Sequence, residues 1–326
     1  MIRASHALLL ALILLSAVPL EVLGQTRQKL YRIGVLETQS ASLNVANLNA
    51  LSVGLRALGY EQGKNLVIEY RSADGRAERF PALAAELIKL PVDVLVTRGT
   101  PAAIAAKNAT MQIPIVMAAI GEPLMVVSSL ARPGGNVTGL SGYSTDLEAK
   151  RVELLHELVP RAVRIAGLYN MGNPVVPPQW QQLDKTARSL GLQSKLLDVR
   201  TSEDISAAFA TAARERVEAV AVGVDALTQT HRKTIADHAI KHRLPVIYVS
   251  REYIEAGGLI AYGPSYPDLY RRAATYIDKI FKGAKPGDLP IEQPVKFELL
   301  INLNTAKAIG LSIPKEILFR ADEVIQ

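Results

Sequence analysis

The chain has 326 residues, of which 49% are hydrophobic and 21% are charged, with a formal net charge of +6 and no cysteine. This composition excludes a mostly disordered chain, and the length suits two domains of ordinary size. The lack of cysteine excludes a disulfide framework and a cysteine that could carry a lipid. Lysine and arginine are dispersed, so the positive charge predicts a solvated basic surface and no nucleic-acid partner.

The first residues have the pattern of an export signal. Arg3 and His6 give a basic start, and an apolar run covers residues 7–18. The residues before Gln25 are small or are of types that a signal-peptide cleavage site accepts. The apolar run is short for a membrane span, so we predict a cleavable signal peptide over residues 1–24. We therefore expect a soluble protein in the periplasm. An uncleaved membrane anchor is the alternative.

Short β-branched runs and longer amphipathic stretches alternate through the first half of the chain. In chain order, the pattern predicts strands at residues 31–36, 66–70, 92–97 and 114–118. Between successive strands it predicts helices at residues 44–58, 77–90 and 101–109. Strands joined by helices at this spacing pair in parallel, because each crossover helix returns the chain to the same edge of the sheet.

The same landmarks recur in the second half of the chain. Residues 31–37, 58–60, 92–96 and 113–116 are echoed, in the same order, by residues 163–169, 190–192, 217–221 and 244–247. The repeat predicts an α/β fold of two doubly wound lobes, each with a parallel sheet, joined by a hinge. Chance similarity between two α/β units is the alternative.

The remaining segments connect these two units. A glycine-rich run at residues 132–142 precedes a strand, whereas a phosphate-binding fingerprint follows one, so we interpret this run as a turn. Further elements are predicted at residues 145–158, 266–281 and 297–303. We expect an N-terminal lobe of residues 25–142 plus about 264–289, and a C-terminal lobe of residues 143–263 plus about 290–326.

Ligands of open parallel sheets bind beyond the carboxyl ends of the strands, so the repeat predicts which residues face the cleft. These ends carry hydrogen-bonding groups and not a set of nucleophiles and bases. The expected ligand-binding residues are Thr38, Gln39, Arg98, Thr100, Ala102, Glu122, Tyr143, Asn170, Asp225, Ser250, Arg251 and Tyr262.

Two features of this set indicate recognition of charge. Thr100, before Pro101, suits the start of a helix whose free amides attract an anion, although simple capping is the alternative. Arg98 is placed either to hold a ligand carboxylate or to be solvated. Asp225 and Glu122 suit an ammonium group, and Asp225 is equally suited to cap the helix that follows it. Together they fit an amino acid zwitterion, while the tyrosines suit an aromatic ligand.

Motifs for catalysis are not found. His238 and His242 are four residues apart, but the sequence shows no third ligand for a metal. No nucleophile elbow, phosphate loop or suitably placed acid pair occurs. We therefore expect no enzymatic activity, no cofactor and no metal.

Several runs are typical of one known family, at residues 99–103, 113–116, 131–139, 168–170, 256–263 and 301–307. Together they resemble the ABC transporter substrate-binding family that includes tryptophan and tyrosine binders, and the likeness covers essentially the whole mature chain. The resemblance implies a type I periplasmic-binding fold, hinge closure on the ligand, and a permease with its ATPase as partners. It places Thr100, Asn170 and Asp225 in the cleft. Glu122 and Arg98 depart from the family pattern, so an aromatic or other organic acid stays open beside an amino acid.

These observations predict a monomeric, periplasmic solute-binding component of an ABC importer. Its ligand is expected to be a small amino acid or an aromatic or organic acid, bound in the interlobe cleft. A ligand-sensing protein coupled to a membrane receptor and a periplasmic enzyme of the same architecture are the alternatives.

Overall fold

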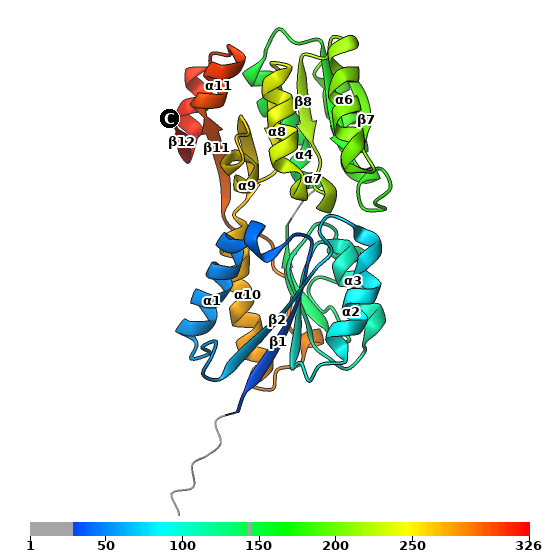
Figure 1. The fold of residues 1–326 in the computed structure, drawn as a ribbon, viewed down its shortest axis with the longest axis vertical. Coiled ribbons are helices and arrows are strands. Elements are labelled where there is room, and N and C mark those ends of the chain that lie inside the picture. The colour runs from blue at the N-terminus through cyan, green and yellow to red at the C-terminus, as the bar shows by residue number, and fades with distance from the viewer. Residues whose placement is uncertain (1–28, 143–144) are drawn as a thin grey trace, which may run out of the picture. The chain divides into compact units, whose positions relative to one another are not determined.

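The computed structural model describes residues 29–142 and 145–326, so the expected signal peptide and Tyr143 lie outside the described residues. Residues 31–326 form one compact unit, in which two α/β lobes each contain a single sheet (Figure 1). None of the helices in the described part of the chain has the length and apolar character needed to span a membrane.

The first lobe is built on a five-stranded parallel sheet in the order β2-β1-β3-β4-β5. Its strands are β1 (Tyr31–Glu37), β2 (Leu66–Ser72), β3 (Val94–Arg98), β4 (Ile115–Ile120) and β5 (Val137–Ser141). All residues of β3, β4 and β5 are buried, which is typical of a parallel sheet covered on both faces.

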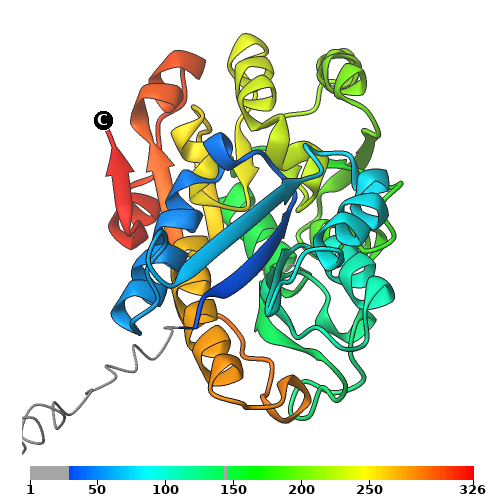
Figure 2. The same ribbon diagram turned by 60° about the horizontal axis from the view of Figure 1, so that its bottom comes forward.

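Helices cover both faces of this sheet. One face carries α1 (Val45–Ala57) and α10 (Tyr266–Phe281), and the other carries α2 (Phe80–Ile88) and α3 (Thr100–Ala109) (Figure 2). Because side chains alternate along a strand, Ile33 packs in the core beside α1 and α10, whereas Leu36 packs in the core beside α2 and α3. The late helix α10 is therefore part of the first lobe's core.

The second lobe has a seven-stranded sheet in the order β12-β11-β10-β9-β8-β6-β7. Its strands are β6 (Arg164–Tyr169), β7 (Gln193–Asp198), β8 (Ala219–Val222), β9 (Val246–Tyr248), β10 (Ile260–Pro264), β11 (Phe297–Asn302) and β12 (Glu323–Ile325). β11 is antiparallel to β10, whereas the other pairs are parallel. The antiparallel pair arises because the chain leaves β10 for α10 in the first lobe and returns from there.

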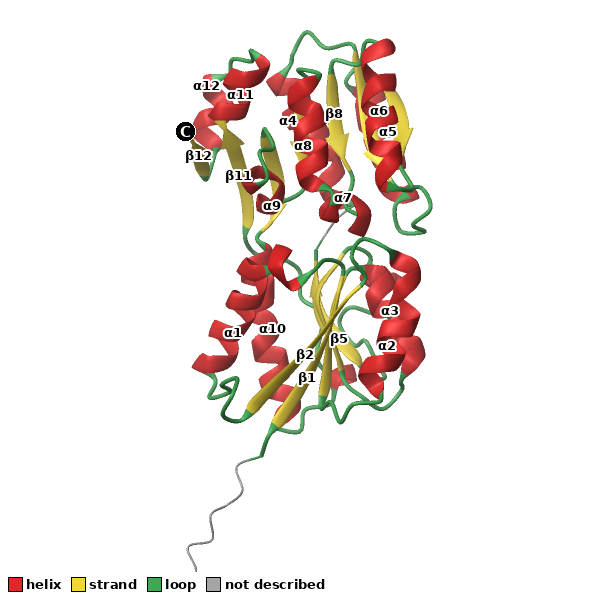
Figure 3. Ribbon diagram, in the orientation of Figure 1, coloured by secondary structure: helices red, strands yellow, loops and turns green. Residues whose placement is uncertain are grey.

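Helices again lie on both sides of the sheet (Figure 3). α4 (Asp146–Leu158), α5 (Pro177–Ser189), α11 (Leu303–Ile309) and α12 (Lys315–Arg320) share one core, and α6 (Ser202–Arg214), α8 (Arg232–Lys241) and α9 (Arg251–Glu255) share the other. A short helix, α7 (Ala226–Thr230), follows β8. The predicted fold class, two doubly wound lobes on parallel sheets, is confirmed.

Candidate functional site

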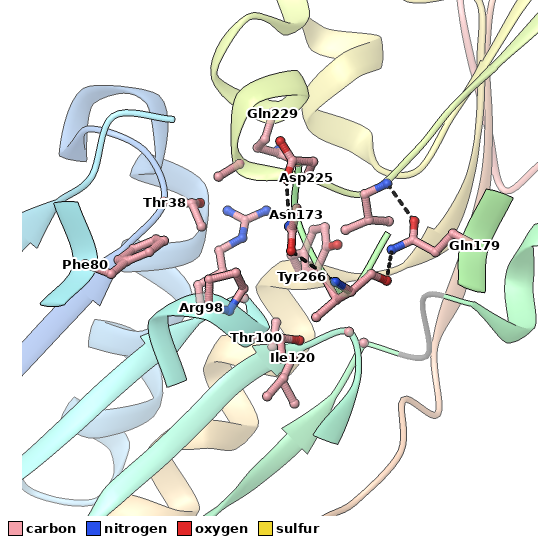
Figure 4. Close-up of a pocket in the computed structure, with 18 residues that line it drawn as sticks. Thr38, Phe80, Arg98, Thr100, Ile120, Asn173, Gln179, Asp225, Gln229 and Tyr266 are labelled. Carbon is pink, nitrogen blue, oxygen red and sulfur yellow. Dashed lines mark hydrogen bonds between the residues drawn. The ribbon is translucent and has the colours of Figure 1, made fainter. Parts of the chain in front are cut away.

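A pocket of about 610 Å³, part of it open to solvent, lies where the carboxyl ends of the two sheets face each other. The residues that line it and are labelled in Figure 4 are Thr38, Phe80, Arg98, Thr100, Ile120 and Tyr266 from the first lobe, and Asn173, Gln179, Asp225 and Gln229 from the second. Thr38, Arg98, Thr100 and Asp225 are thus brought together at one pocket.

Asp225 is both a helix cap and a pocket residue. Its Oδ1 accepts hydrogen bonds from the Leu227 amide at 2.8 Å and from Asn170 Nδ2 at 3.1 Å, and its Oδ2 accepts one from Asn173 Nδ2 at 2.7 Å. Only 7% of the residue is exposed. Burial raises the pKa of the carboxyl above its ordinary value, although these hydrogen bonds oppose the shift. The two functions considered for Asp225 are therefore compatible in one side chain.

Helix α3 begins differently from the sequence prediction. Gly99, with a φ of 83°, occupies the N-cap position, and the Thr100 hydroxyl does not cap the helix. That hydroxyl accepts a hydrogen bond from the Glu122 amide at 3.1 Å instead. Gly99, Thr100 and Pro101 all line the pocket, so the first turn of α3 is at its wall. The amides of a first turn lack intrahelical acceptors and favour an anion.

Thr38 contributes a hydroxyl with an unused hydrogen-bonding capacity. The residue follows β1, lines the pocket and is 7% exposed. Its Oγ1 is buried and has no hydrogen-bond partner among the described residues. A buried polar atom without a hydrogen-bond partner is costly, so this hydroxyl is well placed to form a hydrogen bond with a ligand.

Arg98 lines the pocket, but its guanidinium is neither solvated nor available to bind a ligand carboxylate. Its Nη1 and Nη2 lie 3.0 and 2.9 Å from the two carboxylate oxygens of Glu252, and its guanidinium lies 4.4 Å from the centre of the Tyr266 ring. Burial disfavours the charge on Glu252, but Arg98, together with Asn47 and Arg232, holds the pKa of Glu252 below its ordinary value. Both groups therefore stay ionised as a buried pair.

Four further residues of the predicted set support the site without lining the pocket. Gln39 and Ser250 donate hydrogen bonds to Glu252, at 3.4 and 3.1 Å. Asn170 donates to Asp225, as described above. Glu122 is half-buried beside the pocket and accepts a hydrogen bond from the Thr145 hydroxyl. Burial raises the pKa of the Glu122 carboxyl above its ordinary value.

Three predicted residues are directed elsewhere. Ala102 is fully buried and packs inward from α3 into the core of the first lobe. Arg251 forms ion pairs with Glu298 and Glu323 on β11 and β12. Tyr262 stacks on the Phe297 ring of the neighbouring strand. The structure does not bring these side chains to the pocket, because each is committed to packing or pairing within its own lobe.

Sequence reasoning missed several residues of the site. Asn173 is in the loop that also holds Asn170, so proximity in sequence could have identified it. Phe80 and Tyr266 begin helices α2 and α10 and reach the pocket only through the packing of those helices. No local sequence signal distinguishes them from core aromatics.

Known proteins are similar to this chain over most of its length. A family described as ABC transporter substrate binding protein matches residues 33–325. A tyrosine-binding protein of Clostridioides difficile is 28% identical over 256 residues, which are 78% of this chain and 73% of that protein.

Solved structures are similar over most of the chain. A conserved domain protein of Vibrio cholerae is 30% identical with a TM-score of 0.85, and an ABC domain of Streptococcus pneumoniae in complex with L-Trp is 27% identical with a TM-score of 0.83. Each match covers 91% of this chain and 100% of the other. The resemblance found in the sequence is confirmed, and the chain belongs to the ABC transporter substrate-binding protein family.

Proposed function

We propose that this protein binds an α-amino acid with an apolar or aromatic side chain in the interlobe pocket. The observation that carries the proposal is the buried carboxylate of Asp225. It lines the pocket and accepts hydrogen bonds from amides, but it forms no ion pair with any residue in the described part of the chain. A buried carboxylate without a cation is costly, so a ligand ammonium group is its natural partner.

The opposite wall of the pocket suits the carboxylate of the same ligand. The unpartnered Thr38 hydroxyl and the first turn of α3 are both in the first lobe, whereas Asp225 is in the second. An amino acid held at both ends would therefore bridge the lobes. Ligands that bridge two lobes favour the closed form, which is how hinge-closing proteins signal occupancy.

The rest of the lining favours an apolar ligand side chain. Phe80, Pro101, Ile120, Val175 and Val224 contribute apolar walls between the two polar ends. Burying an aromatic side chain there would supply a large part of the binding free energy. The names of the relatives above, one binding tyrosine and one in complex with L-Trp, are consistent with such a ligand.

A plain organic acid is a weaker candidate. Recognition of such a ligand by Arg98 would require its guanidinium, which is already engaged at both Nη atoms by Glu252. The Asp225 carboxylate would then repel the ligand.

The experiment is a binding series with purified residues 25–326. The ligands are L-tryptophan, L-tyrosine, tryptamine, which lacks the carboxylate, and indole-3-propionate, which lacks the ammonium group. We expect an amino acid to raise the melting temperature, and a ligand at 100 times its dissociation constant adds about 2.7 kcal/mol. Removing either charged group should abolish most of the shift. A shift with indole-3-propionate alone would contradict the zwitterion proposal.

We further propose that the signal peptide is removed after residue 24 and that the mature protein supplies a permease and its ATPase from the periplasm. Family membership supports this assignment. Mass measurement of the protein released by osmotic shock should give a chain that begins at Gln25. Recovery of the full-length chain in the membrane fraction would instead indicate an anchor. Loss of ligand uptake on deletion, restored by the wild-type gene, would test the transport function.

A further inference from the structure

The Arg98–Glu252 ion pair joins the two lobes. Arg98 ends β3 of the first lobe, and Glu252 is in α9 of the second lobe, 154 residues away in sequence. The side chains are 5% and 9% exposed, and the pairing is bidentate, with distances of 3.0 and 2.9 Å. Bidentate pairing of this kind constrains orientation as well as distance, so it favours the relative position of the lobes in which both hydrogen bonds form.

Further hydrogen bonds converge on the same carboxylate from both lobes. Its donors are Asn47 at 2.8 Å and Gln39 at 3.4 Å from the first lobe, and Ser250 at 3.1 Å together with the Gln229 amide from the second. Glu252 is therefore saturated by protein groups and has little capacity left for a ligand.

A second arginine strengthens the same contact. Arg232 of α8 donates to the Gln39 side-chain oxygen at 2.9 Å and to the Leu43 carbonyl at 3.1 Å. Gln39 thus links an arginine of the second lobe to the carboxylate that Arg98 binds. The two lobes therefore meet through a continuous polar network of direct hydrogen bonds.

From these contacts we infer that Arg98 and Glu252 form a latch, a pair of positioning residues that stabilises the closed, ligand-binding arrangement of the lobes without touching the ligand's charged groups. Because the two residues belong to different lobes, a movement of the lobes apart at this contact would break the pair. Separation would exchange the pair for water, whereas closure without one partner would bury an uncompensated charge.

The latch is adjacent to the pocket. Arg98 and Gln229 line the pocket while they also contact Glu252, so the position of the latch and the shape of the pocket are coupled. The apparent dissociation constant equals the intrinsic one divided by the fraction of molecules in the binding-competent form. A tenfold loss of the closed fraction should therefore weaken binding tenfold, even with Thr38 and Asp225 unchanged.

The inference deepens the proposed function, so the deciding measurement is made on ligand-free protein. The chain has no cysteine, and the exposed residues Lys89 in the first lobe and Lys185 in the second can each be replaced by a cysteine for labelling. Distances between the two labels, from pulsed electron paramagnetic resonance, report the populations of closed and open molecules. We expect a closed population in the parent protein and at least a fivefold smaller one in the Glu252→Gln variant.

A matched control separates closure from stability. Glu148 and Arg151 form another buried ion pair, but both are in α4 of the second lobe. Glu148→Gln should lower the melting temperature and leave the label distances unchanged. The double variant Arg98→Met/Glu252→Gln removes both charges, so it should melt closer to the parent than either single variant and still lose the closed population.

The possible outcomes are distinct. Parent-like label distances in Glu252→Gln, or a parent protein without any closed population, would overturn the latch. Weaker L-tryptophan binding by about tenfold in Glu252→Gln would support it. Absence of L-tryptophan and L-tyrosine binding by the parent would overturn the proposed ligand, whereas the label distances would still decide the latch.

Discussion

Asn173 Nδ2 donates a hydrogen bond to Asp225 Oδ2 over 2.7 Å, and both residues line the pocket between the lobes. The amide comes from the loop after β6, and the carboxylate caps the helix after β8. The carboxylate is thereby oriented before any ligand arrives. Preorganisation of this kind lowers the entropic cost of binding.

Replacing Asp225 by Asn should weaken the binding of an amino acid without unfolding the protein. Asparagine retains the shape of the side chain and can cap α7, but it removes the charge that faces the ligand ammonium. A hydrogen bond to a charged group is worth about 1.5–3 kcal/mol, so we expect a loss of roughly 10- to 150-fold in affinity. Titration calorimetry with L-tryptophan measures it, and an unchanged affinity would remove Asp225 from the site.

Replacing Thr38 by Val should change affinity and stability in opposite directions. The buried hydroxyl has no protein partner, so its removal should raise the free energy of unfolding of the ligand-free protein by about 1 kcal/mol. Loss of its hydrogen bond to the ligand should weaken binding about fivefold.

Thr138 provides the matched control for this substitution. It is also buried, but its hydroxyl donates to the Leu289 carbonyl at 2.8 Å, outside the pocket. Thr138→Val should therefore lower stability and leave affinity unchanged. Equal effects of the two substitutions in urea denaturation and in calorimetry would show that Thr38 has no special relation to the ligand.

Acidification should weaken the binding of an amino acid, and the loss should begin at pH values above 3.8, the ordinary pKa of Asp. Burial raises the pKa of Asp225, so this carboxyl takes up a proton earlier than an exposed one as the pH falls. The ionised form binds the ammonium group, and affinity is therefore retained above the raised pKa and lost below it. Calorimetry between pH 4 and 7 should show this loss in the parent protein but not in Asp225→Asn.

The same shift predicts the sign of a change in stability. Without ligand, the folded protein binds more protons at Asp225 than the unfolded chain does at pH values around the ordinary pKa and the raised pKa of this carboxyl. The contribution of Asp225 to the free energy of unfolding therefore decreases as the pH rises through this range. The difference in stability between the parent and Asp225→Asn, followed by urea denaturation, should move in that direction. The opposite slope would show that the pKa is lowered.

Two glycines of the run at residues 132–142 should respond differently to alanine. Gly139 pairs with Met117 across β4 and β5, has a φ of 137°, and a Cβ there would lie 2.2 Å from the Met117 carbonyl oxygen. Gly135 has a φ of 62°, and nothing lies within 4 Å of its Cβ position. Gly135→Ala should cost about 1–2 kcal/mol for its backbone conformation. Gly139→Ala should cost about 1–3 kcal/mol more for the steric conflict, as measured by urea denaturation. Equal costs would contradict the close approach.

Much of the fold could be predicted because its signals are local. The apolar periodicity at residues 266–281 predicted helix α10 with the same bounds, since the period of a helix is written in consecutive residues. The helix predicted at residues 77–90 is instead a 3-10 turn at Ala77–Arg79 followed by α2. Pro81 suits the first turn of α2, where its missing amide costs no hydrogen bond.

The duplicated strand pattern also determined which edge of each sheet carries the site. All parallel strands of a sheet end at the same edge, and so Thr38, Arg98, Thr100 and Asp225 could be placed there from their positions after strands. What only the tertiary structure decided is where each side chain points and with what it pairs. Ala102 faces the core, and Arg98 is held by a carboxylate 154 residues away in the other lobe. The local periodicity of a sequence predicts the backbone conformation of one element at a time. The Arg98–Glu252 pair depends instead on how two separately folded lobes approach each other.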